Sequence, residues 1–290
     1  MKIGIVGYGS IGTRHAANAA ALGHKVLVYD PAGRRDVPVE REIYEFCDAV
    51  VLATPSFRHT SGIRACVERG KHVLVEKPIC TDDAGLYDLL TMADEKKLVV
   101  MMGNNLRFHP CVQRASVWLD AGSPPVWANF ICATTTERTG ILADGVILNT
   151  GSHEVDMALH LLGPAHVVAA TTTESRERDV SVDFVLEHAC GARSNFHLDF
   201  ETPVEVREAW ISAGMAGNMH FNLPARKAYL AQPEGESYFN DQGSYGEDYI
   251  AEMQAFVDRI EGKETLGASG WDGLYTLKVL LDVRRMAGLK

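Results

Sequence analysis

Residues 1–12 read MKIGIVGYGSIG, and this stretch decides the fold of the first part of the chain. An apolar run is followed at once by the pattern G-x-G-x-x-G and then by an alanine-rich segment. A strand before the pattern and a helix after it form the context in which such a turn binds a dinucleotide. The residues predicted to form this cofactor turn are Gly7, Tyr8, Gly9, Ser10, Ile11 and Gly12.

Each glycine of the turn has a physical reason. Gly7 allows the tight turn, Gly9 lets a pyrophosphate approach the backbone, and Gly12 lets the helix pack closely on the strand. Net charge does not forbid an anionic cofactor, because backbone amides and a helix N-terminus hold phosphates locally.

The end of the second apolar run bears on the choice between NAD and NADP. Asp30 stands there, where a carboxylate can accept hydrogen bonds from the ribose hydroxyls of NAD. Asp30 favours NAD because it would repel a 2′-phosphate. Arg34 and Arg35 follow closely, however, and could receive that phosphate of NADP if the loop folds back.

The first third of the chain alternates short apolar runs with helical segments. The predicted strands are residues 2–6, 25–29, 49–53, 72–75 and 98–102, and the predicted helices are residues 13–22, 40–46, 58–68 and 82–96. The runs are rich in Val, Ile and Leu, as strands buried on both faces are. This alternation predicts a parallel sheet with helical crossovers, a Rossmann domain over residues 1–118.

After about residue 120 the pattern changes to short strands with turn signals between them. The predicted strands are residues 126–135, 166–173, 180–187, 192–200, 206–213 and 220–222, and residues 31–38, 136–144 and 232–244 are the long loops. One helix is predicted at residues 152–162, with Ser152 as its N-cap, and two more at residues 246–260 and 270–287. Residues 119–290 are therefore expected to form an α+β domain with a mainly antiparallel sheet.

Composition excludes several classes of partner. The formal net charge is −10, so the basic footprint of a nucleic-acid-binding protein is missing. The sequence contains no apolar run of about 18 residues, so no membrane span is expected. The first residues do not resemble a signal peptide, and the six cysteines form no C-x-x-C pair. We expect free thiols and a cytoplasmic protein.

Glu76, Lys77 and Pro78 follow the fourth predicted strand. In an open α/β sheet the carboxyl ends of the strands face the ligand crevice. Lys77 is there a candidate for proton transfer, provided that burial and the cationic nicotinamide lower its pKa. A solvated surface lysine is the alternative.

His153 is predicted in the first turn of a helix, with Asp156 and His160 on the same face. Imidazole is a natural relay for a hydroxyl proton near neutral pH, and Asp156 could orient it. The alternative is a histidine that only hydrogen-bonds at the start of the helix. The spacing of the three side chains matches no familiar zinc pattern, so no metal is predicted.

Several segments together resemble the glucose–fructose oxidoreductase / inositol dehydrogenase / rhizopine-catabolism (Gfo/Idh/MocA) family of NAD(P)-dependent oxidoreductases. The resemblance runs nearly end to end. The matching segments are residues 7–12, residues 53–59 (ATPSFRH, with Ser56 where Asn is usual), residues 76–79 (EKPI), residues 103–110 (GNNLRFHP), residues 145–156 and residues 272–274 (DGL). The EKP motif is the most specific of them.

The resemblance implies a Rossmann domain followed by an open-faced sheet domain, residues 119–290, which binds the substrate and forms a homodimer or homotetramer through its sheet. It implies Lys77 and His153 as the polar catalytic pair. The remaining candidates are cofactor-binding Thr54, Pro55, His59, Glu76, Lys77 and Arg107, with Asn105, Arg138, Asn149 and His153 as candidate substrate contacts. One departure is Asn149, where many members have Asp, so a relay through an aspartate is absent. The L-N-x-G-x-H pattern leans towards members that act on nucleotide-linked sugars.

We therefore expect an NAD(P)-dependent oxidoreductase that moves a hydride between nicotinamide and a carbinol carbon of a sugar, polyol or nucleotide sugar. Two alternatives remain open. One is a glycoside hydrolase that uses bound NAD for transient oxidation, and the other is a non-catalytic dinucleotide-binding sensor. Net reduction of the cofactor separates the dehydrogenase from both.

Overall fold

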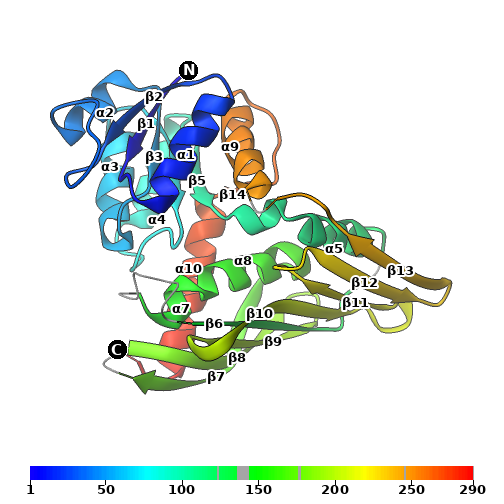
Figure 1. The fold of residues 1–290 in the computed structure, drawn as a ribbon. Helices are drawn as coiled ribbons and strands as arrows, with labels where there is room; N and C mark the ends of the chain where they lie inside the picture. Colours follow the sequence, from blue (N-terminus) through cyan, green and yellow to red (C-terminus); the bar gives the residue numbers. More distant parts are fainter. Residues whose placement is uncertain (123, 136–143, 176–177, 245, 290) are drawn as a thin grey trace. The chain divides into compact units, whose positions relative to one another are not determined.

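The computed structural model describes residues 1–122, 124–135, 144–175, 178–244 and 246–289 (Figure 1). They divide into two compact units, Met1–Phe108 with Ser244–Leu277, and His109–Gly243 with Lys278–Lys290. This division differs from the expected boundary after residue 118. A late segment returns to the first unit because its helix α9 (Glu247–Ile260) buries apolar side chains there.

The first unit contains a six-stranded sheet. Its strands are β1 (Lys2–Val6), β2 (Lys25–Tyr29), β3 (Ala49–Leu52), β4 (His72–Glu76), β5 (Val100–Gly103) and β14 (Ala268–Ser269). Their order is β14-β5-β4-β3-β1-β2, and all neighbours are parallel except the short β14, which runs antiparallel to β5. The predicted parallel sheet is confirmed, and β14 was not predicted.

Helices cover both faces of this sheet. The alternation along β1 shows how: Ile3 and Ile5 belong to the core with α1 (Ser10–Ala21) and α9, which pack against each other. Gly4, between them, faces α2 (Glu40–Phe46), where a Cβ would collide with Ile43. Helices α3 (His59–Glu68) and α4 (Leu86–Glu95) pack together, and the turns η1 (Ser56–Arg58) and η2 (Asn105–Phe108) follow β3 and β5 (Figure 1).

The second unit contains an eight-stranded sheet of order β13-β12-β11-β10-β6-β9-β8-β7. Its strands are β6 (Trp127–Thr135), β7 (Ala165–Ser175), β8 (Arg178–His188), β9 (Arg193–Asp199), β10 (Glu201–Ser212), β11 (Asn218–Asn222), β12 (Lys227–Gln232) and β13 (Gly235–Asn240). All neighbours are antiparallel except β6 and β9. The expected loop at residues 232–244 was wrong, because β13 pairs with β12 in a hairpin.

Alternation along the strands buries one face of this sheet. On β9, Ser194, Phe196 and Leu198 are buried. The helices that pack on the sheet include α5 (Pro110–Asp120), α7 (Gly145–Asn149) and α8 (Gly151–Leu162), and α10 (Gly270–Met286) continues through the boundary at Leu277 (Figure 1). The turn η3 (Gly214–Ala216) joins β10 to β11.

The start of α8 differs from the prediction. Ser152 is not an N-cap, because Thr150 already has helical angles and α8 begins at Gly151. The Ser152 hydroxyl instead donates to the Leu148 carbonyl oxygen of α7. The two short helices therefore follow each other almost without interruption. In the part of the chain described here, no helix combines the length and apolarity needed to cross a membrane.

Candidate cofactor and catalytic site

The carboxyl ends of the parallel strands form one edge of the first unit's sheet. The order β2-β1-β3-β4-β5 means that the chain leaves β1 to one side and later returns to β3 on the other. Open α/β sheets bind ligands in the crevice at such a switch point. Each loop at this edge carries a predicted site residue: Gly7 after β1, Asp30 after β2, Thr54 after β3, Lys77 after β4 and Asn105 after β5.

The glycine turn after β1 has the geometry that the sequence predicts. Gly7 has a φ of 91°, and a Cβ there would collide with the carbonyl oxygen of Ala53. A Cβ at Gly12 would collide with the carbonyl oxygen of Gly7, so glycine lets α1 begin this close to the turn. At Gly9 the described residues place nothing within 4 Å of an added Cβ. A ligand can therefore approach the backbone at Gly9 closely.

The N-terminus of α1 fits a phosphate group. Gly9 is its N-cap and has no side chain that could accept from the backbone N–H groups, and the first turn of the helix contains no acidic residue. Ser10 and Ile11 open the helix. Backbone N–H groups and the helix dipole at this end favour an anion. The residues present thus fit the pyrophosphate of a dinucleotide.

Asp30 is held by backbone N–H groups. Its Oδ2 accepts from Tyr8 at 2.7 Å, and its Oδ1 accepts from Ala32 at 2.8 Å. The hydrogen bond from Tyr8 is the largest cause that lowers the pKa of Asp30, so the carboxylate is ionised near neutral pH. Arg34 lies over the Tyr8 ring, 5.5 Å from its centroid, and pairs with Asp36. Asp30 therefore presents a fixed negative charge at the end of β2.

His59 connects the loops after β3 and β4. Its ring is 1% exposed, with Nδ1 2.8 Å from the Pro78 carbonyl oxygen and Nε2 2.8 Å from the Thr54 carbonyl oxygen. Carbonyl oxygens only accept, so both bonds form together when both ring nitrogens carry protons. The structure thus gives His59 a place between the two loops, while Pro55 is exposed at the edge. The Lys77–Pro78 peptide bond is cis.

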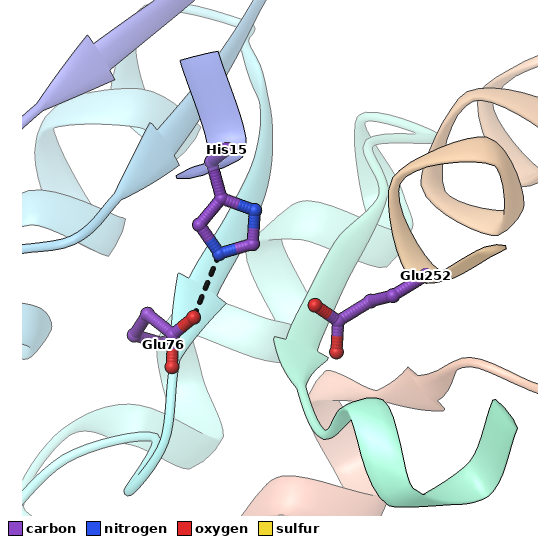
Figure 2. Close-up of side chains that lie close together, drawn as sticks. All are labelled: His15, Glu76 and Glu252. Atoms are coloured by element: carbon purple, nitrogen blue, oxygen red, sulfur yellow. Dashed lines mark hydrogen bonds and ion pairs between the residues drawn. The ribbon is translucent and has the colours of Figure 1, made fainter. Parts of the chain in front are cut away.

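Lys77 follows β4 directly and is partly exposed. Its backbone N–H donates to Oε2 of Glu76 at 3.2 Å, and Oε1 of Glu76 lies 2.7 Å from Nε2 of His15 on α1 (Figure 2). Burial opposes ionisation of Glu76, but the hydrogen bond and charge of His15 outweigh it and lower the pKa. Glu76 is therefore an ionised carboxylate, held from α1, beside the candidate catalytic lysine.

Glu252 faces the same pair from α9 (Figure 2). It is 1% exposed, and both its carboxyl oxygens lack a hydrogen-bond partner among the described residues. Burial, then the charges of Glu76 and Asp248, raise its pKa well above the usual value. A nitrogen of His15 and one oxygen from each glutamate lie within 4.8 Å of one another. We assign a protonated, neutral Glu252, because a second buried carboxylate beside Glu76 would be strongly unfavourable.

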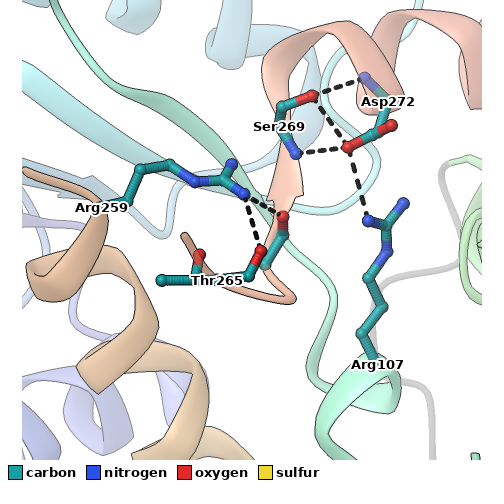
Figure 3. Close-up of polar contacts among 6 residues, drawn as sticks. Arg107, Arg259, Thr265, Ser269 and Asp272 are labelled. Carbon is teal, nitrogen blue, oxygen red and sulfur yellow. Dashed lines mark hydrogen bonds and ion pairs between the residues drawn. The ribbon is translucent and has the colours of Figure 1, made fainter. Parts of the chain in front are cut away.

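Arg107 lies in η2 with Asn105, and both are buried. Arg107 Nη1 donates to Oδ2 of Asp272 at 3.4 Å (Figure 3). Asp272 and Ser269 bond reciprocally at the start of α10: Asp272 accepts the Ser269 N–H at 2.7 Å, and Ser269 Oγ accepts the Asp272 N–H at 3.1 Å. This reciprocal pair is a capping arrangement, and it fixes the carboxylate that holds Arg107. Arg259, nearby, donates to two backbone carbonyls.

In the second unit, His153 lies in the first turn of α8, as predicted, and Asn149 ends α7. Glu154, next to His153, is fully buried and accepts from Nε of Arg207 on β10 at 2.7 Å. This pair ties the first turn of α8 to the sheet. The predicted substrate contact Arg138 falls outside the described residues.

Possible metal-ligating side chains come close together in the first unit, beside Lys77. Among the described residues, the group of His, Cys, Asp or Glu side chains whose donor atoms lie within 4.8 Å is His15, Glu76 and Glu252. His153, Asp156 and His160 do not form such a group.

Three residues of this site were missed in the sequence. His15 follows Gly12 by one turn of α1, which places it towards the sheet. Glu252 stands in line with the buried Met253 and Phe256, an acidic residue in an apolar stripe. That stripe was a usable signal for a functional or proton-sharing acid. Asp36 had no local signal, because its partners depend on how the loop folds.

Comparison with known proteins agrees with this geometry. A family model described as "Oxidoreductase family, NAD-binding Rossmann fold" matches residues 1–104, and a model of the GFO/IDH/MocA C-terminal domain matches residues 133–217. The two matches fall on the two sheets. They confirm the predicted family and fold.

Curated relatives and a solved structure extend the comparison along the whole chain. D-xylose 1-dehydrogenase (NADP(+)) 2 of Haloferax volcanii is 27% identical over 91% of this chain and 90% of its own length. Inositol 2-dehydrogenase 1 of Saccharopolyspora erythraea is 28% identical over 94% and 90%. The structure of UDP-N-acetylglucosamine 3-dehydrogenase from Acidithiobacillus ferrooxidans has a TM-score of 0.89 at 21% identity, covering 99% of this chain and 97% of that chain.

Proposed function

Because this chain belongs to the Gfo/Idh/MocA family of NAD(P)-dependent oxidoreductases, we propose that it transfers a hydride between nicotinamide and a carbinol carbon of a sugar, polyol or nucleotide sugar. The observation that carries the proposal is that three predicted site features lie at one edge of the parallel sheet. The glycine turn, the ionised Asp30 and Lys77 follow β1, β2 and β4, three strands of the same parallel sheet. The relatives named for xylose and inositol support the substrate class.

The residues at this edge divide the work of binding. The backbone of residues 9–12 would hold the pyrophosphate, and Asp30 would accept from ribose hydroxyls. Thr54, Pro55, His59 and Arg107 would bound the cofactor along the loops after β3 and β5. When bound, the nicotinamide supplies the hydride chemistry, and the protein supplies position and electrostatics.

Lys77 is proposed to exchange a proton with the oxygen of the reacting carbinol. Its neighbour Glu76 is held by His15, so the position of the loop after β4 is fixed from α1. His153 is proposed to relay or share that proton, and Asn149 and Asn105 to hydrogen-bond the substrate. Asn149 has no acidic proton, so it orients the substrate and does not enter the relay.

The proposed chemistry is tested by Lys77→Met. Methionine keeps the length and apolar stem of the side chain and removes the proton carrier. We expect turnover to fall by roughly 10²- to 10⁴-fold, the usual contribution of a positioned acid or base, while the affinity for NADH stays within about twofold. Turnover is followed by the absorbance of reduced nicotinamide against a panel of sugars, polyols and UDP-sugars, and affinity by NADH fluorescence.

The same assay distinguishes the alternatives. Near-normal turnover in Lys77→Met overturns the role of Lys77. Product formation with no net reduction of the cofactor identifies a hydrolase. NADH binding without turnover on any compound of the panel, in the unaltered protein, identifies a sensor.

The open face of the second sheet is proposed as the surface of a homodimer or homotetramer. Trp210, His220, Tyr229 and Tyr238 stand opposite one another on β10 to β13. The Trp210 and His220 rings stack at 4.0 Å, yet Trp210 is 42% and Tyr238 77% exposed. An exposed aromatic row of this kind suits a contact between identical chains.

We also propose a cytoplasmic location. All six cysteines are free thiols, as is usual in a reducing compartment.

A further inference from the structure

The loop after β2 folds back on its own strand. Tyr29 and Arg35 form an antiparallel bridge, and the backbone N–H of Asp36 donates to the Val28 carbonyl oxygen at 2.8 Å. Asp36 Oδ2 also accepts the Val28 N–H at 3.0 Å. Asp36 is thus anchored to β2 by both its backbone and its side chain.

From this anchored position Asp36 binds Arg34 through two hydrogen bonds. Arg34 Nε donates to Oδ1 at 3.0 Å and Nη2 donates to Oδ2 at 2.9 Å, while Nη1 donates to the Tyr8 hydroxyl at 3.3 Å. A bidentate pair of this kind is a strong, directional interaction. Each nitrogen of the Arg34 guanidinium group therefore has a protein acceptor.

Arg35 is also occupied, although by neutral acceptors. Its Nε donates to the Asp30 carbonyl oxygen at 3.0 Å, and its Nη2 donates to the Pro31 carbonyl oxygen. The loop does fold back, as a 2′-phosphate site requires. Both guanidinium groups, however, donate their hydrogen bonds to acceptors of the protein. Asp30 meanwhile keeps its charge at the end of β2.

We propose that Asp36 is a positioning residue that determines cofactor specificity: it holds Arg34 in a closed ion pair, so that Arg34 does not meet a 2′-phosphate and NAD is preferred over NADP. This inference rests on the proposed dinucleotide site and concerns which dinucleotide that site takes. A 2′-phosphate carries up to about two negative charges and would lie near Asp30. It could bind only if Arg34 first left Asp36, and the broken pair would leave a second carboxylate nearby.

The test uses Asp36→Asn, which removes the charge and keeps an oxygen that can accept the Val28 N–H. The readout is the ratio of the dissociation constants of NADPH and NADH, measured by fluorescence titration. We expect this ratio to fall by roughly 10- to 100-fold, the contribution of one released charge-assisted pair. The gain should be lost in the double variant Asp36→Asn/Arg34→Gln, because Arg34 is the group released.

Asp48→Asn is the matched control. Asp48 lies in the same unit and also accepts a backbone N–H, from Lys2 at 2.7 Å. Its ratio should stay at the value of the unaltered protein. If Asp36→Asn fails to fold by circular dichroism, Asp36→Ser takes its place, since a hydroxyl can still accept from Val28.

Two outcomes overturn the inference while leaving the proposed function intact. One is an unchanged ratio in a folded Asp36 variant that binds NADH, and the other is a gain that persists without Arg34. Failure of the unaltered protein to bind either NADH or NADPH refutes the proposed function instead.

Discussion

Replacement of Glu252 by glutamine tests the buried acid next to the candidate catalytic lysine. The native side chain is 1% exposed, and burial, then the charges of Glu76 and Asp248, raise its pKa well above the usual value. In the unfolded chain the same group ionises around its ordinary value of 4.5. The unfolded state therefore releases a proton that the folded state keeps, and the stability of the protein falls as pH rises between those two pKa values.

The size of this pH effect on the unfolding free energy follows from the release of one proton on unfolding. Each pH unit inside this window costs the unaltered protein about 1.4 kcal/mol, and the uncharged amide of the variant has no such cost. Between the ordinary pKa and the raised one, the difference in unfolding free energy should therefore move by about 1.4 kcal/mol per pH unit in favour of Glu252→Gln. Glu76 has a lowered pKa and so contributes with the opposite sign, losing its stabilisation as pH falls. It stays ionised in both proteins over this range and cancels in the difference.

Urea unfolding at a series of pH values, followed by tryptophan fluorescence, measures this slope. Glu264→Gln is the matched control, because Glu264 is exposed in the same unit and its replacement should give a flat difference. A flat difference for Glu252→Gln as well would show that Glu252 is ionised in the folded protein. In that case a bound cation or another internal charge must balance it, and the assignment of a neutral acid is wrong.

Two further predictions concern the glycine turn and the open sheet face. Gly7→Ala should destabilise the protein by about 1–3 kcal/mol more than Gly23→Ala in thermal or urea unfolding, because both have positive φ but only Gly7 has a carbonyl oxygen where the Cβ would lie. Equal losses would contradict the collision with Ala53. Trp210→Lys should lower the mass of the assembly in sedimentation velocity, whereas Met215→Lys, 91% exposed in the turn η3, should not. An unchanged mass for the Trp210 variant would place the contact elsewhere.

Much of the first unit could be predicted because its signals are local. The strands Lys2–Val6 and Lys25–Tyr29 and the helix Glu40–Phe46 match their predicted ranges, since apolar runs and helical periodicity show directly in the sequence. The carboxyl ends of parallel strands lie at one edge, so the prediction of a parallel sheet already placed Asp30 and Lys77 at that edge.

What was missed depends on partners distant in sequence. The return of α9 to the first unit is caused by the burial of Met253, Phe256 and Val257, and a boundary drawn at one point of the chain cannot represent it. The strand β13 was taken for a loop, because it is largely exposed and lacks the apolar run of a buried strand. Ser152 has the residue type of an N-cap, but α7 supplies a helical turn before it and a carbonyl for its hydroxyl.

The charged residues at the sheet edge are held in two different ways, and their positions in the sequence could not show which. Three of them form an ion pair with another side chain: Glu76 with His15, Arg34 with Asp36, and Arg107 with Asp272. Asp30 is different, since backbone N–H groups hold its carboxylate. Backbone donors keep a carboxylate ionised without adding a countercharge, so Asp30 favours a ligand that offers hydroxyl donors and disfavours an anion. In the proposed function the N-terminus of α1, whose N-cap is a glycine, would therefore bind the phosphates of the cofactor, and Asp30 would bind the ribose.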